Sequence, residues 1–297
     1  MSSEDKFHHV RDFDHFELPF GEKIHLPPID LFGYEFQITK FMVLQAIAAV
    51  FCFFVFRGLA KRIQGGKPAE GRWWNMWEAI ALYVRDDIVR PTIGHPHHHD
   101  DEAHGHHPEH EHHPVMHDGI NHPADKWLPF IWSCFFYILI CNLLGAIPLM
   151  GSATASISVT GVLAFFAFCM TIYAGVQTSG VTGFFASLCP TMDLPPALKL
   201  VLVPMIWVIE FIGFFIKHGV LAIRLFANIM GGHAVLGVML LFIAMSADSG
   251  ALWYVVTPAS ILGQIGIGLL ELLVAFIQAY VFAMLATLFI STSVNPH

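Results

Sequence analysis

The chain has 297 residues, of which 55% are hydrophobic and 13% are charged, and its mean hydropathy is +0.60. A soluble domain carries about twice that share of charged residues, so the composition indicates a protein that crosses a membrane several times. The formal net charge of −8 says little about partners, but no basic patch in the sequence suggests nucleic acid.

The N-terminal residues 1–37 are polar and acidic, and we expect them to form an exposed arm. Residues 38–58 are apolar and match the roughly 20 residues that a helix needs to cross a bilayer core. Cytoplasmic loops carry an excess of lysine and arginine, so the basic residues that follow place this loop inside and the N-terminus outside. These basic residues are Arg57, Lys61, Arg62, Lys67 and Arg72.

The next segment, 73–89, reads WWNMWEAIALYVRDDIV and is too short and too charged to span a membrane. Its tryptophans gather at one end and its acids lie elsewhere, a pattern typical of an amphipathic helix in the membrane interface. A connector helix outside the membrane is the alternative. With the first span and the basic loop, this helix makes up a unit over 38–94.

A histidine-rich loop is expected over 95–123, with twelve histidines and six acidic residues but no lysine or arginine between 95 and 122. Such a segment buries too little apolar surface to fold, so a disordered insertion is the favoured interpretation. The alternatives are proton buffering and metal binding. We expect no cofactor and no firm metal site; weak metal binding would involve His97, His98, His99, His106, His107, His112 and His113.

The unit 124–197 contains two clear apolar stretches, and we expect membrane spans over 127–149 and 159–178. Asn142 lies near the end of the first span. Residues 180–197 are rich in glycine and proline and are expected to form a loop.

The last unit, 198–297, is expected to be a long helical hairpin. Residues 198–245 contain no strong stop signal, and one helix of this length measures about 70 Å against a bilayer core of about 30 Å. Either the helix breaks near Lys217–His218 or near Gly231–Gly232, or it lies steeply tilted. Five spans in all predict an all-α polytopic membrane protein with a cytoplasmic C-terminus.

Charged residues lie deep in this unit. A charge at the centre of a membrane helix costs about 2.5–3.5 kcal/mol on insertion scales, so such a residue has a functional use or a partner that offsets the cost. Seven-residue steps separate Glu210, Lys217 and Arg224, which places all three on one stripe of a helix. A structural arginine paired with a neighbouring acid is the alternative.

A short turn over 248–252 makes the last two helices antiparallel. In such a pair, residues whose numbers have the same sum lie at the same depth. To within two residues, or about 3 Å of rise, this pairs Arg224 with Gln278 and His233 with Glu271.

Two sequence runs in the hairpin carry a family resemblance. Residues 221–233 read LAIRLFANIMGGH, and residues 271–282 read ELLVAFIQAYVF. Both runs resemble signatures of subunit a of the F-type ATP synthase, and the stretches 142–148 and 195–210 agree more weakly. The resemblance covers about residues 36–291.

The resemblance implies a stator subunit whose last two helices are long and tilted against a rotor ring. Its essential arginine is Arg224, and Gln278 is expected beside it. Protons are expected to enter past Glu271 and His233, whose order is swapped relative to the common family pattern. The implied partners are the c-ring of proteolipid subunits, the peripheral-stalk b subunits and membrane lipid, in a bacterial inner membrane. ATP chemistry is then expected on other subunits of the complex.

The predicted register fits two aqueous half-channels that meet at Arg224. His233 and Glu271 lie toward the outer side, and Glu210 lies toward the inner side. A histidine titrates at physiological pH and a nearby carboxylate couples to it, so the pair suits proton entry. Asn228 is expected to bond channel water. The alternatives are a static His–Glu hydrogen bond, a Glu210 neutralised by the nearby lysine, and a packing role for Asn228.

The histidine-rich loop motivates a second hypothesis, a divalent-metal transporter. Such a protein needs histidine and acidic ligands about one helical turn apart inside its spans. The long helix contains only His218 and His233, and neither has an acid four residues away. This spacing argues against metal transport.

Overall fold

A computed structural model describes ten stretches of the chain. Among them, five helices are long and apolar enough to cross a membrane, which confirms the all-α polytopic fold class. The described stretches are 15–17, 23–25, 28–31, 34–37, 39–63, 69–94, 122–147, 152–187, 196–247 and 250–294.

The N-terminal arm contains four short strands that the sequence analysis did not predict. Strand β1 (His15–Glu17) pairs antiparallel with β2 (Lys23–His25), and β3 (Pro28–Leu31) pairs with β4 (Tyr34–Gln37). Strands of three or four residues carry too little alternation to be recognised from their sequence.

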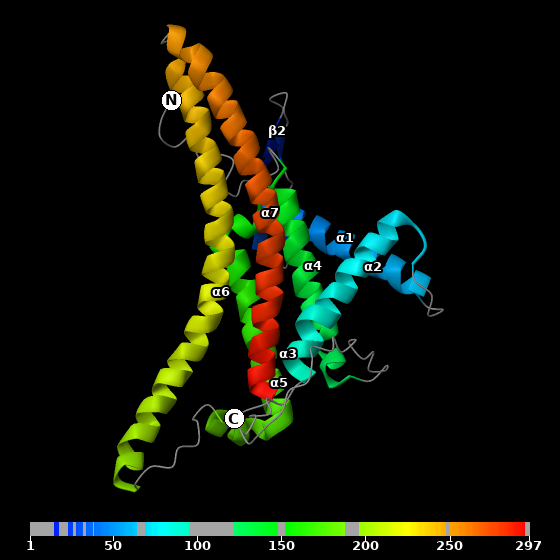
Figure 1. Ribbon diagram of the computed structural model, residues 1–297, viewed down its shortest axis with the longest axis vertical. Helices are drawn as coiled ribbons and strands as arrows, with labels where there is room; N and C mark the ends of the chain where they lie inside the picture. The colour runs from blue at the N-terminus through cyan, green and yellow to red at the C-terminus, as the bar shows by residue number, and fades with distance from the viewer. Residues whose placement is uncertain are drawn as a thin grey trace, which may run out of the picture.

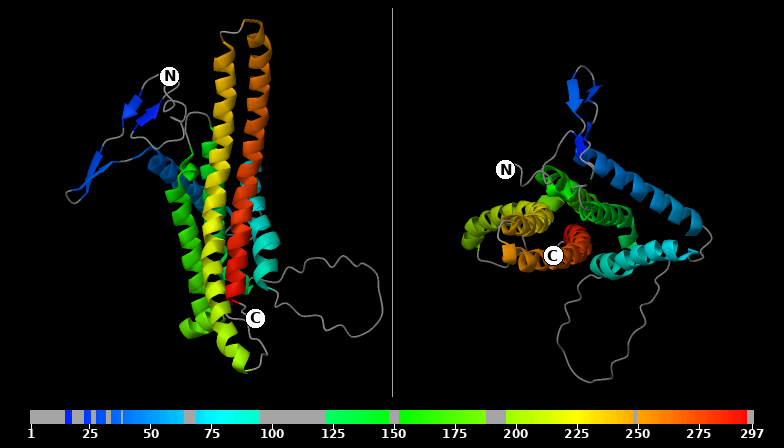
Figure 2. Two further views of the ribbon diagram at one scale, coloured as in Figure 1. Left: turned by 90° about the vertical axis from the view of Figure 1, so that its left-hand side faces the viewer. Right: turned by 90° about the horizontal axis from the view of Figure 1, so that it is seen from above.

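Helices α1 (Lys40–Ile63) and α2 (Arg72–Tyr83) flank the other long helices on one side (Figure 2). The helical path of α2 continues through a π-helical segment, Val84–Val89, into α3 (Arg90–Gly94). This segment is therefore helical as predicted, and it is not among the five candidate spans. Trp77 packs α2 against α4 (Leu128–Gly145), because its ring centroid lies 5.6 Å from that of Phe136.

Helix α4 (Leu128–Gly145) ends in a polar cluster that explains why Asn142 lies at this position. The following 3₁₀ turn, Ala153–Ala155, folds back against the helix end. The Thr154 hydroxyl donates a 2.9 Å hydrogen bond to Asn142 Oδ1, and both residues are buried. This buried bond ties the connection to the helix that it follows.

Helix α5 (Ile157–Ser187) continues where a loop was predicted, so the interpretation of 180–187 as loop was wrong. Gly180 has a φ of 73°, a left-handed conformation that glycine adopts without strain, and the helix resumes beyond this kink. Phe184 then packs so closely on Gly175 that a Cβ there would lie 2.2 Å from the Phe184 ring. The Trp207 indole also donates a 2.9 Å bond to the Phe185 carbonyl, which joins this end of α5 to α6.

Helix α6 (Pro196–Ser246) is one uninterrupted helix of 51 residues, so it does not break at either predicted position. At 1.5 Å per residue its length is about 77 Å. The 3₁₀ turn Gly250–Leu252, with Gly250 at φ 56°, leads to α7 (Trp253–Val294). Figure 1 shows α6 as a curved helix and the hairpin tip projecting beyond α4.

Helix α7 occupies the centre of the bundle and contacts α4, α5 and α6 (Figure 1). Small side chains let these helices approach closely, as is common in membrane proteins. The buried alanines of α7 are Ala275, Ala279, Ala283 and Ala286. This packing holds α6 against one face of the bundle and leaves its other face open.

Candidate functional site

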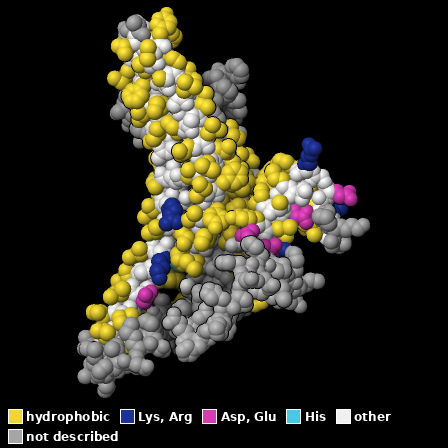
Figure 3. All heavy atoms as spheres, in the orientation of Figure 1, with side chains coloured by type: hydrophobic (Ala, Val, Ile, Leu, Met, Phe, Trp, Pro, Cys, Tyr) yellow, Lys and Arg dark blue, Asp and Glu magenta, His cyan; other side chains and the backbone are white. Residues whose placement is uncertain are grey.

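The charged stripe of α6 lies on the open face of the helix. Figure 3 shows two basic groups and one acidic group in a row on an otherwise hydrophobic surface. Lys217 and Arg224 are exposed, and Glu210 is partly exposed. Lys217 Nζ lies 3.8 Å from Glu210 Oε2, so the pairing with the nearby lysine, named above as the alternative role of Glu210, is present.

Arg224 has no ion pair or hydrogen bond with any residue that the structure describes. The exposed neighbours Val220 and Ile223 are apolar, so the guanidinium stands on a hydrophobic surface. The alternative of an arginine paired with an acid therefore finds no support in the described part of the chain. An arginine in a membrane needs a partner, so this face is suited to an acidic group that is not part of the described residues.

His233 and Glu271 come together across the hairpin, as the register predicts. His233 Nε2 lies 3.9 Å from Glu271 Oε1, and the two side chains are 19% and 9% exposed. Gly232 makes room for the carboxylate, because a Cβ at this position would lie 3.0 Å from Glu271 Oε1. The pair thus lies inside the hairpin, away from the face that carries Arg224.

Gln278 lies on the same face of α7 as Glu271 and is buried. No hydrogen bond joins it to Arg224 among the described residues, although the register places both at similar depth. Asn228 follows Arg224 by about one turn and is partly buried.

Two polar residues of α7 extend this face and were missed by the sequence analysis. Thr257 and Gln264 precede Glu271 by seven-residue steps, so Thr257, Gln264, Glu271 and Gln278 form one polar stripe. In the described structure, Thr257 Oγ1 and the amide nitrogens of both glutamines are buried without a hydrogen-bond partner. Buried polar atoms are normally bonded to protein or to water, so this stripe suits a hydrated path. Counting back from Glu271 in seven-residue steps would have identified this stripe in the sequence.

The histidine-rich loop lies outside the described residues over 95–121, and with it the seven histidines named as weak metal ligands. Within the described stretches, no group of three histidine, cysteine or acidic residues could hold a metal ion.

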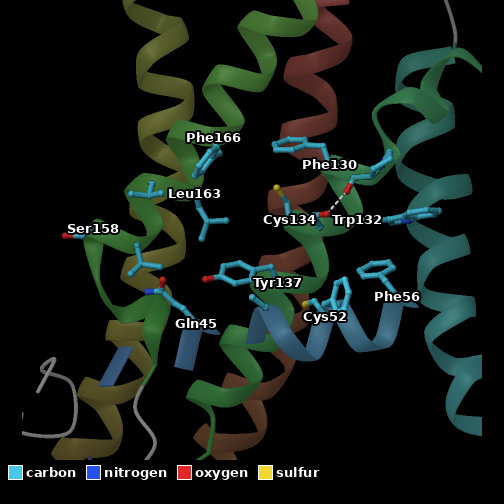
Figure 4. A pocket seen from close by; sticks show the side chains of 16 residues that line it. Gln45, Cys52, Phe56, Phe130, Trp132, Cys134, Tyr137, Ser158, Leu163 and Phe166 are labelled. Atoms are coloured by element: carbon cyan, nitrogen blue, oxygen red, sulfur yellow. Dashed lines mark hydrogen bonds between the residues drawn. The ribbon is translucent and has the colours of Figure 1, made fainter. Parts of the chain in front are cut away.

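A cavity of about 960 Å³ lies between α1, α4 and α5 (Figure 4). Its lining is mainly apolar and includes no acidic, basic or histidine side chain; Gln45, Ser158 and Tyr137 are among its few polar residues. The cavity therefore lacks a carboxylate, an imidazole or a basic group, and none of its lining residues belongs to the charged stripe.

Comparison with known proteins gives consistent matches. Residues 113–291 match the family model described as ATP synthase A chain. The chain is 33% identical over 294 residues to "ATP synthase subunit a" of Chloroherpeton thalassium, covering 98% of this chain and 76% of that relative. It is 35% identical over 286 residues to "ATP synthase subunit a 2" of Chlorobaculum tepidum, and the match covers 95% of this chain and 70% of that relative. It is 43% identical over 224 residues to "ATP synthase subunit a" of Anaeromyxobacter dehalogenans, and the match covers 75% of this chain and 50% of that relative.

Proposed function

The chain belongs to the ATP synthase A chain family, and from this premise we propose that it couples proton flow to rotor movement through Arg224. As a member of this family it is a membrane-spanning stator subunit of the proton-translocating part of the complex. The observation that carries the finer proposal is the arrangement of α6, with Arg224 exposed on its open face and His233 paired with Glu271 inside the hairpin.

The outer half-channel runs along the polar stripe of α7 to the His233–Glu271 pair. Thr257 and Gln264 line its outer part, where their buried polar atoms are suited to binding water. His233 and Glu271, 3.9 Å apart, share and pass on a proton because their titrations are coupled. From there the proton reaches a carboxylate of the rotor ring and neutralises it.

Arg224 separates the two half-channels. An ionised ring carboxylate is attracted to the guanidinium, whereas a neutral one moves on into lipid. Arginine suits this task better than lysine because its guanidinium does not deprotonate in proteins. Gln278 and Asn228 lie near the same level and hold water around the charge. Each proton that crosses supplies about 2.3 kcal/mol per 100 mV of membrane potential.

The inner half-channel passes Glu210, toward which a ring carboxylate releases its proton. Lys217 Nζ lies 3.8 Å from Glu210 Oε2, so an acidic and a basic group stand side by side at this exit. Both side chains are about half exposed, in keeping with a hydrated exit.

The partners in this proposal are the c-ring, which docks on the open face of α6, the peripheral-stalk b subunits, and membrane lipid. The exposed apolar residues around Arg224 provide a surface for an apolar ring helix; they include Ile216, Val220 and Ile223. We place the complex in a bacterial inner membrane, with the N-terminus outside and the C-terminus in the cytoplasm. Strand β2 and the C-terminal end of α7 lie toward opposite ends of the bundle (Figure 1), in keeping with this orientation.

ATP-driven proton pumping in inverted membrane vesicles tests the proposal. We expect Arg224→Ala to abolish pumping while the complex still assembles. Ile223→Ala is the matched control, because Ile223 is an exposed neighbour on the same helix and carries no charge. Pumping by the arginine variant at the rate of the control would contradict the proposal.

A further inference from the structure

His218 is the most deeply buried titratable side chain that the structure describes on α6. Only 3% of the residue is exposed, although Lys217 beside it is exposed. Three phenylalanine rings surround the imidazole, one from each helix that meets here. The ring centroids lie at 5.3 Å for Phe168 of α5, 4.9 Å for Phe214 of α6 and 4.6 Å for Phe289 of α7.

Both nitrogens of this imidazole have polar partners. Nδ1 lies 2.9 Å from the Phe214 carbonyl oxygen, and since a carbonyl only accepts, Nδ1 carries a proton and donates it. Nε2 lies 3.3 Å from the Thr171 hydroxyl of α5, which is itself buried. The Thr171–His218 bond is therefore a buried polar contact between α5 and α6.

This contact is directional, unlike the apolar packing around it. A hydrogen bond weakens steeply with distance and angle, and a buried polar group that loses its partner is costly. Rotation of α6 about its axis would separate Nε2 from Thr171 and leave this buried nitrogen without a partner, while the Thr171 hydroxyl would keep its 2.8 Å bond to the Ala167 carbonyl.

The direction of His218 also determines where its charged neighbours point. On an α-helix, Lys217 lies about 100° and Arg224 about 120° around the axis from His218. With His218 directed into the bundle, both charges lie on the open face. Helix α6 is continuous across these residues, so they move together.

We propose that His218 is a positioning residue that, through Thr171, sets the rotation of α6 and so directs Lys217 and Arg224 toward the rotor face. The functional consequence rests on the role proposed for Arg224 above, whereas the rotation can be measured without it.

The two edges of the open face report this rotation. Lys217 and Gly219 are both exposed and differ by about 200° around the helix, so a rotation buries one and exposes the other. We would place a spin label on Lys217→Cys or Gly219→Cys, with the native cysteines replaced, in the full-length chain in lipid vesicles. The ratio of their oxygen accessibilities then measures the rotation, because mere loosening of the fold changes both labels in the same direction.

Thr171→Val removes the hydroxyl at nearly constant volume, and Thr171→Ser is the matched control that keeps it. We expect the valine variant to change the accessibility ratio at least twofold and to reduce ATP-driven pumping of the complex several-fold. The serine variant is expected to retain both. His218→Gln, which keeps a polar side chain facing Thr171, is expected to restore the ratio relative to His218→Phe.

An unchanged ratio in both Thr171→Val and His218→Phe would overturn the proposal. A changed accessibility ratio with unaffected pumping would support the positioning role of His218 and count against the function proposed for the charged stripe. The two proposals therefore fail in distinguishable ways.

Discussion

The His233–Glu271 pair makes a quantitative prediction about proton entry. If the two residues work as one unit, replacing both reduces the pumping rate by less than the product of the two single reductions. The perturbations are His233→Ala, Glu271→Ala, the double variant, and the exchange His233→Glu with Glu271→His.

The expected coupling follows from the 3.9 Å between His233 Nε2 and Glu271 Oε1. Two unit charges at this distance attract by about 4 kcal/mol at an effective dielectric constant of about 20. At 3.9 Å the two atoms are too far apart for a direct hydrogen bond, and a contact through one bridging water to a neutral imidazole contributes only about 1 kcal/mol. The coupling is thus expected between about 1 and 4 kcal/mol, or between about 5-fold and 1000-fold in rate.

The assay is the initial rate of ATP-driven proton pumping in inverted vesicles, normalised to the amount of assembled complex. We expect each single variant to lose pumping, the double variant to lose little more, and the exchange to recover part of the rate. The exchange keeps one carboxylate and one imidazole at the same two positions, so it is the matched control for loss of the groups themselves. Single effects that multiply in the double variant would refute the reasoning, since they would mean that the two residues act independently.

Two further predictions concern stability, measured by thermal unfolding of the purified complex. The Arg90 guanidinium donates two hydrogen bonds, of 2.9 Å and 3.1 Å, to the Asp125 carboxylate and lowers its pKa. The ion pair therefore stabilises the folded state fully at pH values above the pKa that Asp125 has in the unfolded chain. This contribution is lost as the pH falls through the lower pKa of the folded state. Asp125→Asn should therefore lower the stability by about 0.5–1 kcal/mol near pH 7 and leave it unchanged in acid. An equal loss of stability at both pH values would contradict this prediction. Gly175→Ala should cost about 1–3 kcal/mol because its Cβ would lie 2.2 Å from Phe184. Gly161→Ala, where a Cβ meets nothing within 4 Å, should be neutral, and equal effects would contradict this packing argument.

The pairing of His233 with Glu271 could be predicted because it depends on few quantities. A short turn and two helices of uniform rise determine which residues of a hairpin share a depth, and neither depends on distant contacts. The charged stripe of α6 could be predicted for the same reason, since a seven-residue step keeps Glu210, Lys217 and Arg224 on one face.

Other features depend on tertiary packing and were not predictable. The sequence around Gly180 has the composition of a loop, yet α5 continues because Phe184 packs against Gly175. The continuity of α6 was likewise undetermined, since Gly231 and Gly232 permit a break without requiring one. His218 could be identified as titratable but not as buried, because its neighbours Thr171 and Phe289 come from two other helices.

The geometry of α6 constrains how a proton passes from the entry pair to the rotor. His233 follows Arg224 by nine residues, which places it on the opposite side of the helix and about 13 Å further along its axis. On the proposed path, a proton therefore has to move around α6 as well as along it. Gly231 lies one seven-residue step beyond Arg224 on the charged stripe, and a Cβ there would meet no atom within 4 Å. Gly232 lies between this open position and the Glu271 carboxylate, so two residues without side chains keep the shortest route around the helix clear.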